Sequence, residues 1–326
     1  MVTVVKEEKH KEKEHKHAKA PAPAKVHGRH MLDEILSWSK TVLLTQLVDP
    51  GDLVCELFCG RGGEAKRWAR TPVGHYVGVD PSESALRDAQ SRWQSRRNSR
   101  DVGGEQRHPA FHVDFVQQDP RKGALFRGAA STRAFDLVCT HNGLSIAFAS
   151  EDHARRLLAG VAACLRPGGL FFGTMPDSAA IWYKAQKSKS SPPSFKGEEF
   201  TVAFERENIE QFGTPYKIKL QGEGGRDEAH YMVHIPSFIE LAREVGLQLV
   251  DMPNLVEFFE DYRHTFGTQL KAMCPQLERD LGREHRKDRK DRIMSLVQLF
   301  TIFVFRRCEP HPSLAPPPPR MAAPAQ

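Results

Sequence analysis

Residues 53–63 read LVCELFCGRGG, an apolar run that breaks into a glycine-rich turn. The run from Leu53 to Phe58 predicts a buried strand, and the residues from Ala65 to Trp68 predict a helix directly after the turn. Small residues let the backbone approach a ligand closely, and in an open α/β sheet such a turn lies where a nucleotide-like ligand binds. The same turn can also serve only for packing, so the rest of the chain must decide.

Short apolar runs alternate with helical periodicity through the middle of the chain. Further strands are expected at residues 75–80, 111–117, 135–140, 170–174, 247–250 and 299–305. After a Ser150 cap, apolar residues recur at helical spacing up to Leu165, and Pro167-Gly168-Gly169 is expected to stop that helix and turn the chain. Another helix is expected from Pro236 to Gly246. This alternation predicts a doubly wound α/β sheet.

The two ends of the 326-residue chain differ from its middle in composition. The segment from Met1 to about Arg29 is dense in Lys, Glu and His, and Ser313 to Gln326 is rich in Pro and Ala, so neither can build a core. We therefore expect disordered tails at residues 1–30 and 308–326 around one domain at 31–307. The N-terminal tail is either a plain solvated segment, or an arm that adds non-specific RNA affinity or a nuclear import signal.

Charge and cysteine usage limit the class of protein. Lys and Arg number 47 against 41 Asp and Glu, a net charge of +6 that favours a polyanionic partner. No apolar run approaches the roughly 18 residues of a membrane span, and no apolar signal segment begins the chain, which predicts a soluble intracellular protein. The six scattered cysteines fit reduced thiols, and Cys55 and Cys59 have no partner pair at zinc spacing, so no metal site is expected.

Two carboxylates sharpen the prediction of a ligand site. Asp80 ends the second strand and Asp119 follows the third, and acids at successive strand ends point to one cleft. In that position Asp80 would accept both hydroxyls of an adenosine ribose, and Asp119 would accept from the adenine amino group. Asp80 would repel a 2′-phosphate, which disfavours NADP. The alternative for either residue is an N-cap on the following helix.

At this point the residues support a family resemblance. The block from Glu56 to Glu64, with Lys66-Arg67-Trp68 after it, resembles the cofactor block of eukaryotic mRNA cap guanine-N7 methyltransferases. The similarity continues through LRPGGLFFGTMPDS at residues 165–178 and through segments at 212–216, 233–238 and 255–259, so it covers about residues 36–305. Residues 176–182 and 238–246 look most like the second, divergent type of plants and green algae.

The resemblance implies a fold, a reaction and partners. The fold would be that of class I S-adenosylmethionine methyltransferases, a mostly parallel seven-stranded sheet with a substrate lid inserted at about residues 179–235. The reaction would transfer the methyl group of S-adenosylmethionine to N7 of the guanosine cap. Guanine N7 carries a free lone pair, so no general base is needed and no catalytic side chain is predicted. The partner would be 5′-capped RNA in the nucleus, with other capping-enzyme components as further candidates and a monomer as the expected state.

The resemblance also assigns roles to individual residues. Lys40 matches the lysine that approaches the cofactor carboxylate, and the other positions that would line the cofactor are Glu56, Phe58, Gly60, Asp80, Asp119, His141 and Ile146. Three basic positions match residues directed at the cap triphosphate, with solvated helix arginines as the alternative: Arg61, Arg67 and Arg92. The other positions that would bind the substrate are Leu36, Ser37, Ser145, Glu228, His230 and Phe300.

Several of these positions depart from the family pattern. Phe58 replaces a glycine, and its ring must turn aside if the cofactor is to approach the backbone there. His141 replaces a Gln, and Ser145-Ile146 replace a His-Tyr pair. His230 stands in place of a guanine-reading Glu, and Phe300 in place of a Tyr. If the segment is a strand, Glu228 lies on the same face as His230 and would supply the lost acceptor.

Two other functions remain open from sequence. The altered guanine pocket is compatible with a non-catalytic S-adenosylmethionine- or RNA-binding partner in a capping complex. A small-molecule methyltransferase on the same fold is the other alternative, since fold alone does not fix function. The three phosphate-directed arginines argue against the latter.

Overall fold

The computed structural model describes residues 28–98, 111–123, 125, 134–141, 143–220, 227–275, 277 and 287–308. Of the predicted tails, residues 1–27 and 309–326 lie outside these ranges, whereas residues 28–30 begin the first helix. Within the described ranges no helix is long and apolar enough to cross a membrane.

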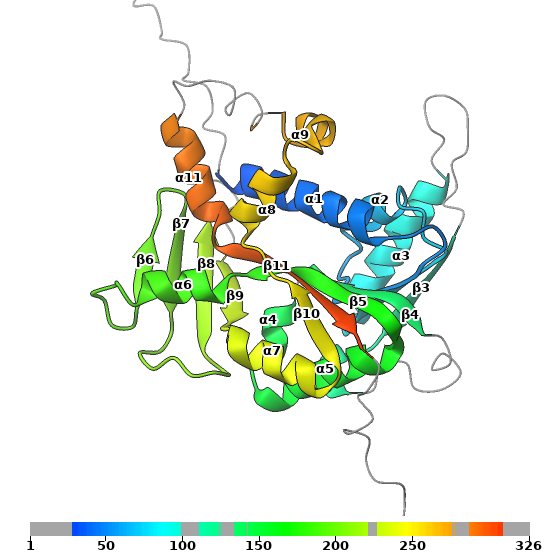
Figure 1. The fold of residues 1–326 in the computed structure, drawn as a ribbon, viewed down its shortest axis with the longest axis horizontal. Helices are drawn as coiled ribbons and strands as arrows, with labels where there is room; N and C mark the ends of the chain where they lie inside the picture. Colours follow the sequence, from blue (N-terminus) through cyan, green and yellow to red (C-terminus); the bar gives the residue numbers. More distant parts are fainter. Residues whose placement is uncertain are drawn as a thin grey trace, which may run out of the picture.

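A seven-stranded, mostly parallel sheet forms the centre of the protein (Figure 1). Its strands, in spatial order, are β10 (Leu247–Asp251), β11 (Phe300–Arg307), β5 (Leu165–Pro176), β4 (Phe135–Thr140), β1 (Leu53–Leu57), β2 (His75–Asp80) and β3 (His112–Gln117). Only β11 runs antiparallel to its neighbours. The predicted doubly wound sheet is thereby confirmed.

The order of the strands reverses at β1, which pairs in parallel with β2 on one side and with β4 on the other. In open α/β sheets the crevice for ligands lies at such a switch point, outside the carboxyl ends of the strands. The glycine-rich turn that follows β1 opens into this crevice and leads to α2 (Ala65–Trp68), the helix that the sequence predicted there.

Helices cover both faces of the sheet (Figure 1). One face carries α1 (Gly28–Leu47), α8 (Leu255–Tyr262) and α11 (Lys287–Val297), whose apolar residues join one buried cluster. The other face carries α4 (Leu144–Ala147), α5 (Glu151–Cys164) and α7 (Ile235–Glu244) around a second cluster. The other helices with bounds inside the described ranges are α3 (Glu83–Asn98), η1 (Pro120–Lys122), α6 (Ser178–Ala185) and α9 (Gly267–Met273).

Local signals in the sequence explain where α5 begins and ends. The Ser150 side chain accepts a hydrogen bond from the His153 amide (3.2 Å), so it caps the helix as predicted. The helix already ends at Cys164, and Pro167-Gly168-Gly169 lies inside β5. Phe135 of β4 pairs with Leu165 and Leu137 with Leu170, so these residues form a bulge in β5.

A second, antiparallel sheet lies between α6 and α7 in the chain. Its strands are β6 (Ser194–Lys196), β7 (Phe200–Phe204), β8 (Pro215–Leu220) and β9 (Asp227–Tyr231), and it stands beside the main sheet (Figure 1). These strands fall within residues 179–235, the segment for which the sequence predicted a substrate lid. That this segment closes over a substrate stays a prediction.

Candidate functional site

The turn after β1 is built from residues with positive φ. Gly60 (φ 53°) and Gly62 (φ 68°) adopt the left-handed conformation that favours glycine, and a Cβ on Gly62 would lie 3.0 Å from Ala89 of α3. Phe58 has a φ of 56°, which is uncommon for a residue with a side chain. Its ring lies against Gly143, where an added Cβ would come within 2.7 Å of the ring. The Phe58 ring is thus turned aside onto the loop after β4.

The two strand-end carboxylates hold the backbone beside this turn. Asp80 accepts hydrogen bonds from the amides of Gly60 and Ser82, both at 2.9 Å. Asp119 caps η1 by accepting from the Arg121 amide, and it also pairs with the Arg121 guanidinium at 2.8 and 2.9 Å. The hydrogen bonds from Arg121 lower the pKa of Asp119. Asp119 therefore plays the capping role that the sequence left as an alternative.

A cavity of about 620 Å³ opens at the carboxyl edge of the main sheet. It is bounded by α1, the turn before α2, the loop after β4, the end of β5, and strands β8 and β9. The cavity gathers nine of the side chains that the sequence assigned to the site: Lys40, His141 and Ile146 for the cofactor, and Leu36, Ser37, Arg67, Ser145, His230 and Phe300 for the substrate.

Apart from Glu228, the other predicted site residues do not line the cavity. They are Glu56, Phe58, Gly60, Arg61, Asp80, Arg92 and Asp119. Arg61 is exposed and forms an ion pair with Asp88 of α3 (2.9 Å), and Arg92 is exposed on the same helix. Glu228 lies on β9 two residues before His230, on the same face of the strand, but its side chain is outside the described residues.

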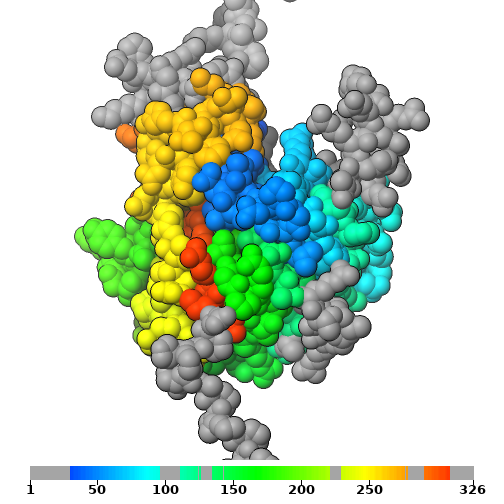
Figure 2. Space-filling view, turned by 45° about the vertical axis from the view of Figure 1, so that its right-hand side comes forward, coloured from blue at the N-terminus to red at the C-terminus, as the bar shows by residue number. Residues whose placement is uncertain are grey.

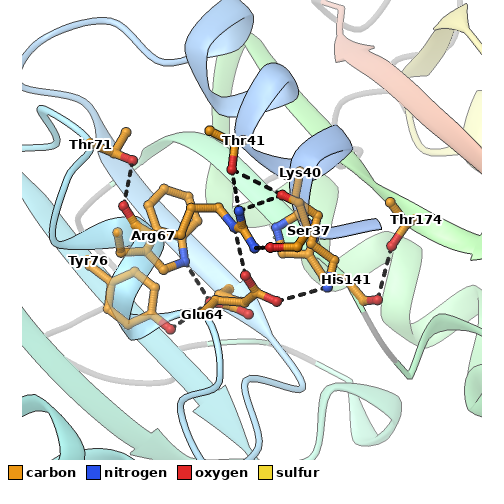
Figure 3. A network of polar contacts seen from close by, with 11 residues as sticks. Ser37, Lys40, Thr41, Glu64, Arg67, Thr71, Tyr76, His141 and Thr174 are labelled. Carbon is orange, nitrogen blue, oxygen red and sulfur yellow. Dashed lines mark hydrogen bonds and ion pairs between the residues drawn. The ribbon is translucent and has the colours of Figure 1, made fainter. Parts of the chain in front are cut away.

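A network of charges joins α1 to the glycine-rich turn (Figure 3). Glu64 accepts from Lys40 Nζ and from Arg67 Nε, both at 2.8 Å. The Arg67 guanidinium also donates to the Ser37 carbonyl (2.6 Å), the Ser37 hydroxyl (3.1 Å) and the Thr41 hydroxyl. The sequence interpretation did not assign Glu64 to the site. Its signal was present, because Glu64 ends the block that resembles the family and stands where the family has Asp.

The two carboxylates of this region have opposite pKa shifts. Burial raises the pKa of Glu64, but the charge of Lys40 and the other neighbouring cations outweigh burial, so the pKa falls below its ordinary value. Burial, and then the charge of Glu64, raise the pKa of Glu56 to about 7. Glu56 accepts hydrogen bonds from Trp68 Nε1 (2.7 Å) and from the Tyr76 hydroxyl (2.8 Å). These hydrogen bonds stabilise the charged carboxylate, but they offset only part of the rise in its pKa that burial causes. Glu56 thus anchors α2 and β2 beneath the turn.

His141 is the buried imidazole of the cavity. Its side chain is 3% exposed, and neither ring nitrogen has a hydrogen-bond partner among the residues that the structure describes. Burial, and then the charge of Lys40, lower the pKa of His141 to about 3. The Thr174 hydroxyl holds the backbone by donating to the His141 carbonyl (3.1 Å). The ring is therefore neutral at physiological pH, and it belongs to the cavity lining with two uncommitted nitrogen atoms.

A hydrogen bond connects the helices of the main sheet to the second sheet at the cavity. The Ser145 hydroxyl lies 3.2 Å from His230 Nδ1, which joins α4 to β9. Both residues occupy positions where the chain departs from the family pattern. Phe300, a third departure, closes the cavity from β11.

Comparison with known proteins gives one consistent family. The family model for the mRNA (guanine-N(7))-methyltransferase domain matches residues 6–308. The chain is 33% identical over 296 residues to mRNA cap guanine-N(7) methyltransferase 2 of Oryza sativa subsp. japonica, covering 87% of this chain and 81% of the relative. It is 32% identical over 298 residues to the enzyme of the same name from Arabidopsis thaliana, covering 87% and 78%. Among solved structures, the CcbJ methyltransferase from Streptomyces caelestis shares the fold, with a TM-score of 0.50 at 14% identity over 83% of this chain and 89% of that one.

The raised pKa of Glu56 predicts a pH dependence of stability. Its pKa of about 7 in the folded chain lies above the ordinary 4.5, so unfolding between these pH values releases a proton and stability falls as pH rises through the window. Glu56→Gln removes this ionisation. We expect its free energy of unfolding, relative to the parent, to rise by up to about 3 kcal/mol between about pH 5 and about pH 7, at roughly 1.4 kcal/mol per pKa unit. Urea denaturation of the protein without cofactor measures this difference, and the exposed Glu198→Gln is the control. If the difference in free energy of unfolding between Glu56→Gln and the parent does not change with pH, the prediction is wrong.

Proposed function

Since the chain belongs to the mRNA cap guanine-N7 methyltransferase family, we propose that its cavity transfers the methyl group of S-adenosylmethionine to N7 of the guanosine cap of RNA, converting GpppN to m7GpppN. The observation that carries the proposal is the convergence of cofactor-assigned and substrate-assigned side chains on one cavity at the switch point of the sheet. The RNA substrate implies work in the nucleus. A monomer, alone or with other capping-enzyme components, is the expected form.

The charged network suits the methionyl end of the cofactor. That end carries a carboxylate and an ammonium group. From adjacent positions at the cavity wall, Lys40 presents a positive charge to the carboxylate and Glu64 presents a negative charge to the ammonium group. Asp80 is assigned to the ribose hydroxyls and Asp119 to the adenine amino group, each in addition to the backbone contacts that it already makes. The glycine turn, with Glu56 beneath it and the Phe58 ring turned onto Gly143, lies between these groups.

The reaction needs alignment more than acid or base chemistry. S-Adenosylmethionine supplies an electrophilic methyl group on a sulfonium centre, and guanine N7 attacks with its own lone pair. The chain's side chains therefore act by orienting the two molecules and excluding water. His141 contributes a neutral ring, which adds no positive charge beside a cationic donor. No catalytic base is assigned.

The substrate side divides into guanine and phosphate contacts. Leu36, Ser37, Ser145, His230 and Phe300 are assigned to the guanosine, with Glu228 as the acceptor for its N1 and N2 protons. The phosphate contacts fall chiefly to Arg61 and Arg92. Arg67 already donates from Nε to Glu64, and its terminal nitrogens donate to the Ser37 carbonyl, the Ser37 hydroxyl and the Thr41 hydroxyl. It therefore acts first as a link between α1 and α2.

A direct assay tests the function. Incubation with methyl-labelled S-adenosylmethionine and GpppG-capped RNA, followed by nuclease digestion, is expected to yield labelled N7-methylguanosine. Uncapped RNA of the same sequence is the control and should stay unlabelled. Cofactor binding without any labelled nucleoside would favour the non-catalytic partner instead.

Removal of the Asp80 carboxylate tests the cofactor assignment. Asp80→Ala is expected to weaken S-adenosylmethionine binding, measured by calorimetry, at least about tenfold, which corresponds to about 1.4 kcal/mol of lost hydrogen bonding. Asp80→Asn keeps one acceptor oxygen and should lose less. Equal binding by the parent and the Ala variant would remove Asp80 from the site.

The phosphate assignment predicts a separation of substrate and cofactor effects. The Arg61→Ala, Arg92→Ala double variant should raise KM for capped RNA, more steeply at low salt, while its S-adenosylmethionine affinity stays near that of the parent. Arg155→Ala, Arg156→Ala on α5 removes two exposed arginines outside the cavity lining and serves as the matched control. If the Arg61 and Arg92 variant binds capped RNA like the parent across a salt series, the result favours the alternative that the protein methylates a small molecule.

A further inference from the structure

A second cavity of about 900 Å³ lies on the other side of Arg67. It runs between α1, α2 and α9, and we name it the α1–α2–α9 groove. Figure 2 shows α1 (blue) at the surface directly beside the yellow and orange segments that hold α8 and α9. The groove and the first cavity share four lining residues: Ser37, Gly63, Glu64 and Arg67. The two cavities therefore adjoin, and Arg67, whose guanidinium bridges to α1 (Figure 3), belongs to the wall of both.

Among the residues that the structure describes, the groove carries two cations without an acidic partner. Lys66 on α2 and Arg70 in the turn after it are exposed, and neither has an ion-pair partner within the described ranges. Glu64 is the one acidic residue in the described lining, and Lys40 and Arg67 already pair with it. Uncompensated cations four residues apart suit neighbouring phosphates of one strand.

The remaining lining suits a ribose backbone. Thr41, Thr45 and Thr71 line the groove, and the hydroxyl of each donates to a backbone carbonyl of its own helix or turn. The oxygens of these hydroxyls still have lone pairs, which can accept from ribose 2′-hydroxyls. Leu44 and Met273 add apolar surface for the faces of sugars or bases.

We propose that the α1–α2–α9 groove binds the sugar-phosphate backbone of the RNA nucleotides that follow the cap. The inference rests on the proposed function and extends it from the cap to the body of the RNA. An RNA strand that leaves the first cavity past Gly63 meets Lys66 and Arg70 next, because Gly63 belongs to both linings. The cap then determines the site of reaction, and the groove adds affinity that is independent of RNA sequence.

The test compares short and long substrates with the full-length chain. Lys66→Ala, Arg70→Ala removes the two uncompensated cations without touching the first cavity. We expect KM for the dinucleotide GpppG to stay unchanged and KM for a GpppG-capped oligoribonucleotide to rise about tenfold. Fluorescence anisotropy of the capped oligoribonucleotide should show that the slope of log K against log salt becomes less steep by about 1.4, at roughly 0.7 per single-strand phosphate contact.

The matched control removes the two exposed arginines of α5, Arg155→Ala and Arg156→Ala, for the same change of charge outside both cavities. Equal losses in both double variants would show a diffuse charge effect and overturn the groove. Equal RNA binding by the parent and the Lys66 and Arg70 variant would also overturn it. Failure of the proposed function is distinguishable, because it would appear as absence of N7-methylguanosine with every RNA, whatever the variants bind.

Discussion

The carboxylate of Glu64 between Lys40 and Arg67 is the interaction on which the site depends. The three side chains are only 10 to 14% exposed, and charges in such surroundings are stable only when they are paired. The pairing joins α1 to the turn after β1. It holds Lys40 at the wall of the first cavity and directs Arg67 across to Ser37 and Thr41. One carboxylate thereby shapes both cavities.

Electrostatics in the first cavity agree with methyl transfer from a cation. Glu64 remains ionised because Lys40 stabilises its charge, whereas His141 remains neutral because it is buried near the same lysine. A second protonated group beside a sulfonium would oppose binding of the donor. A neutral ring with unused nitrogen atoms instead adds polar contacts without adding charge. The buried His141 therefore fits a site that works by orientation.

The departures from the family pattern are matched by other residues of this chain. Phe58 adopts a conformation that glycine tolerates better, and it does so where Gly143 leaves room for its ring. Ser145 and His230 stand where the family pattern has other residues, and their side chains lie 3.2 Å from each other. The second sheet supplies His230 and α4 supplies Ser145, so the region proposed for the guanosine depends on both parts of the structure.

Much of the fold was determined by local sequence. The buried run before the glycine turn, the Ser150 cap and the alternation of strands with helices predicted the sheet, because apolar periodicity, capping and glycine act within a few residues. Similarity to the family then supplied the correspondences of Lys40, Asp80 and the arginines. The bulge at Pro167-Gly168-Gly169 was not predicted, since it depends on pairing with β4.

Only the tertiary structure decided which of these groups meet. Glu64 lies 24 residues from Lys40, and Ser145 lies 85 residues from His230. The α1–α2–α9 groove likewise joins α1 and α2 to a helix far along the chain. A sequence pattern reports the preferences of neighbouring residues, whereas contacts between distant side chains depend on how whole helices and sheets pack. That packing minimises exposed apolar surface and unpaired charge over the entire domain at once, so no single segment contains it.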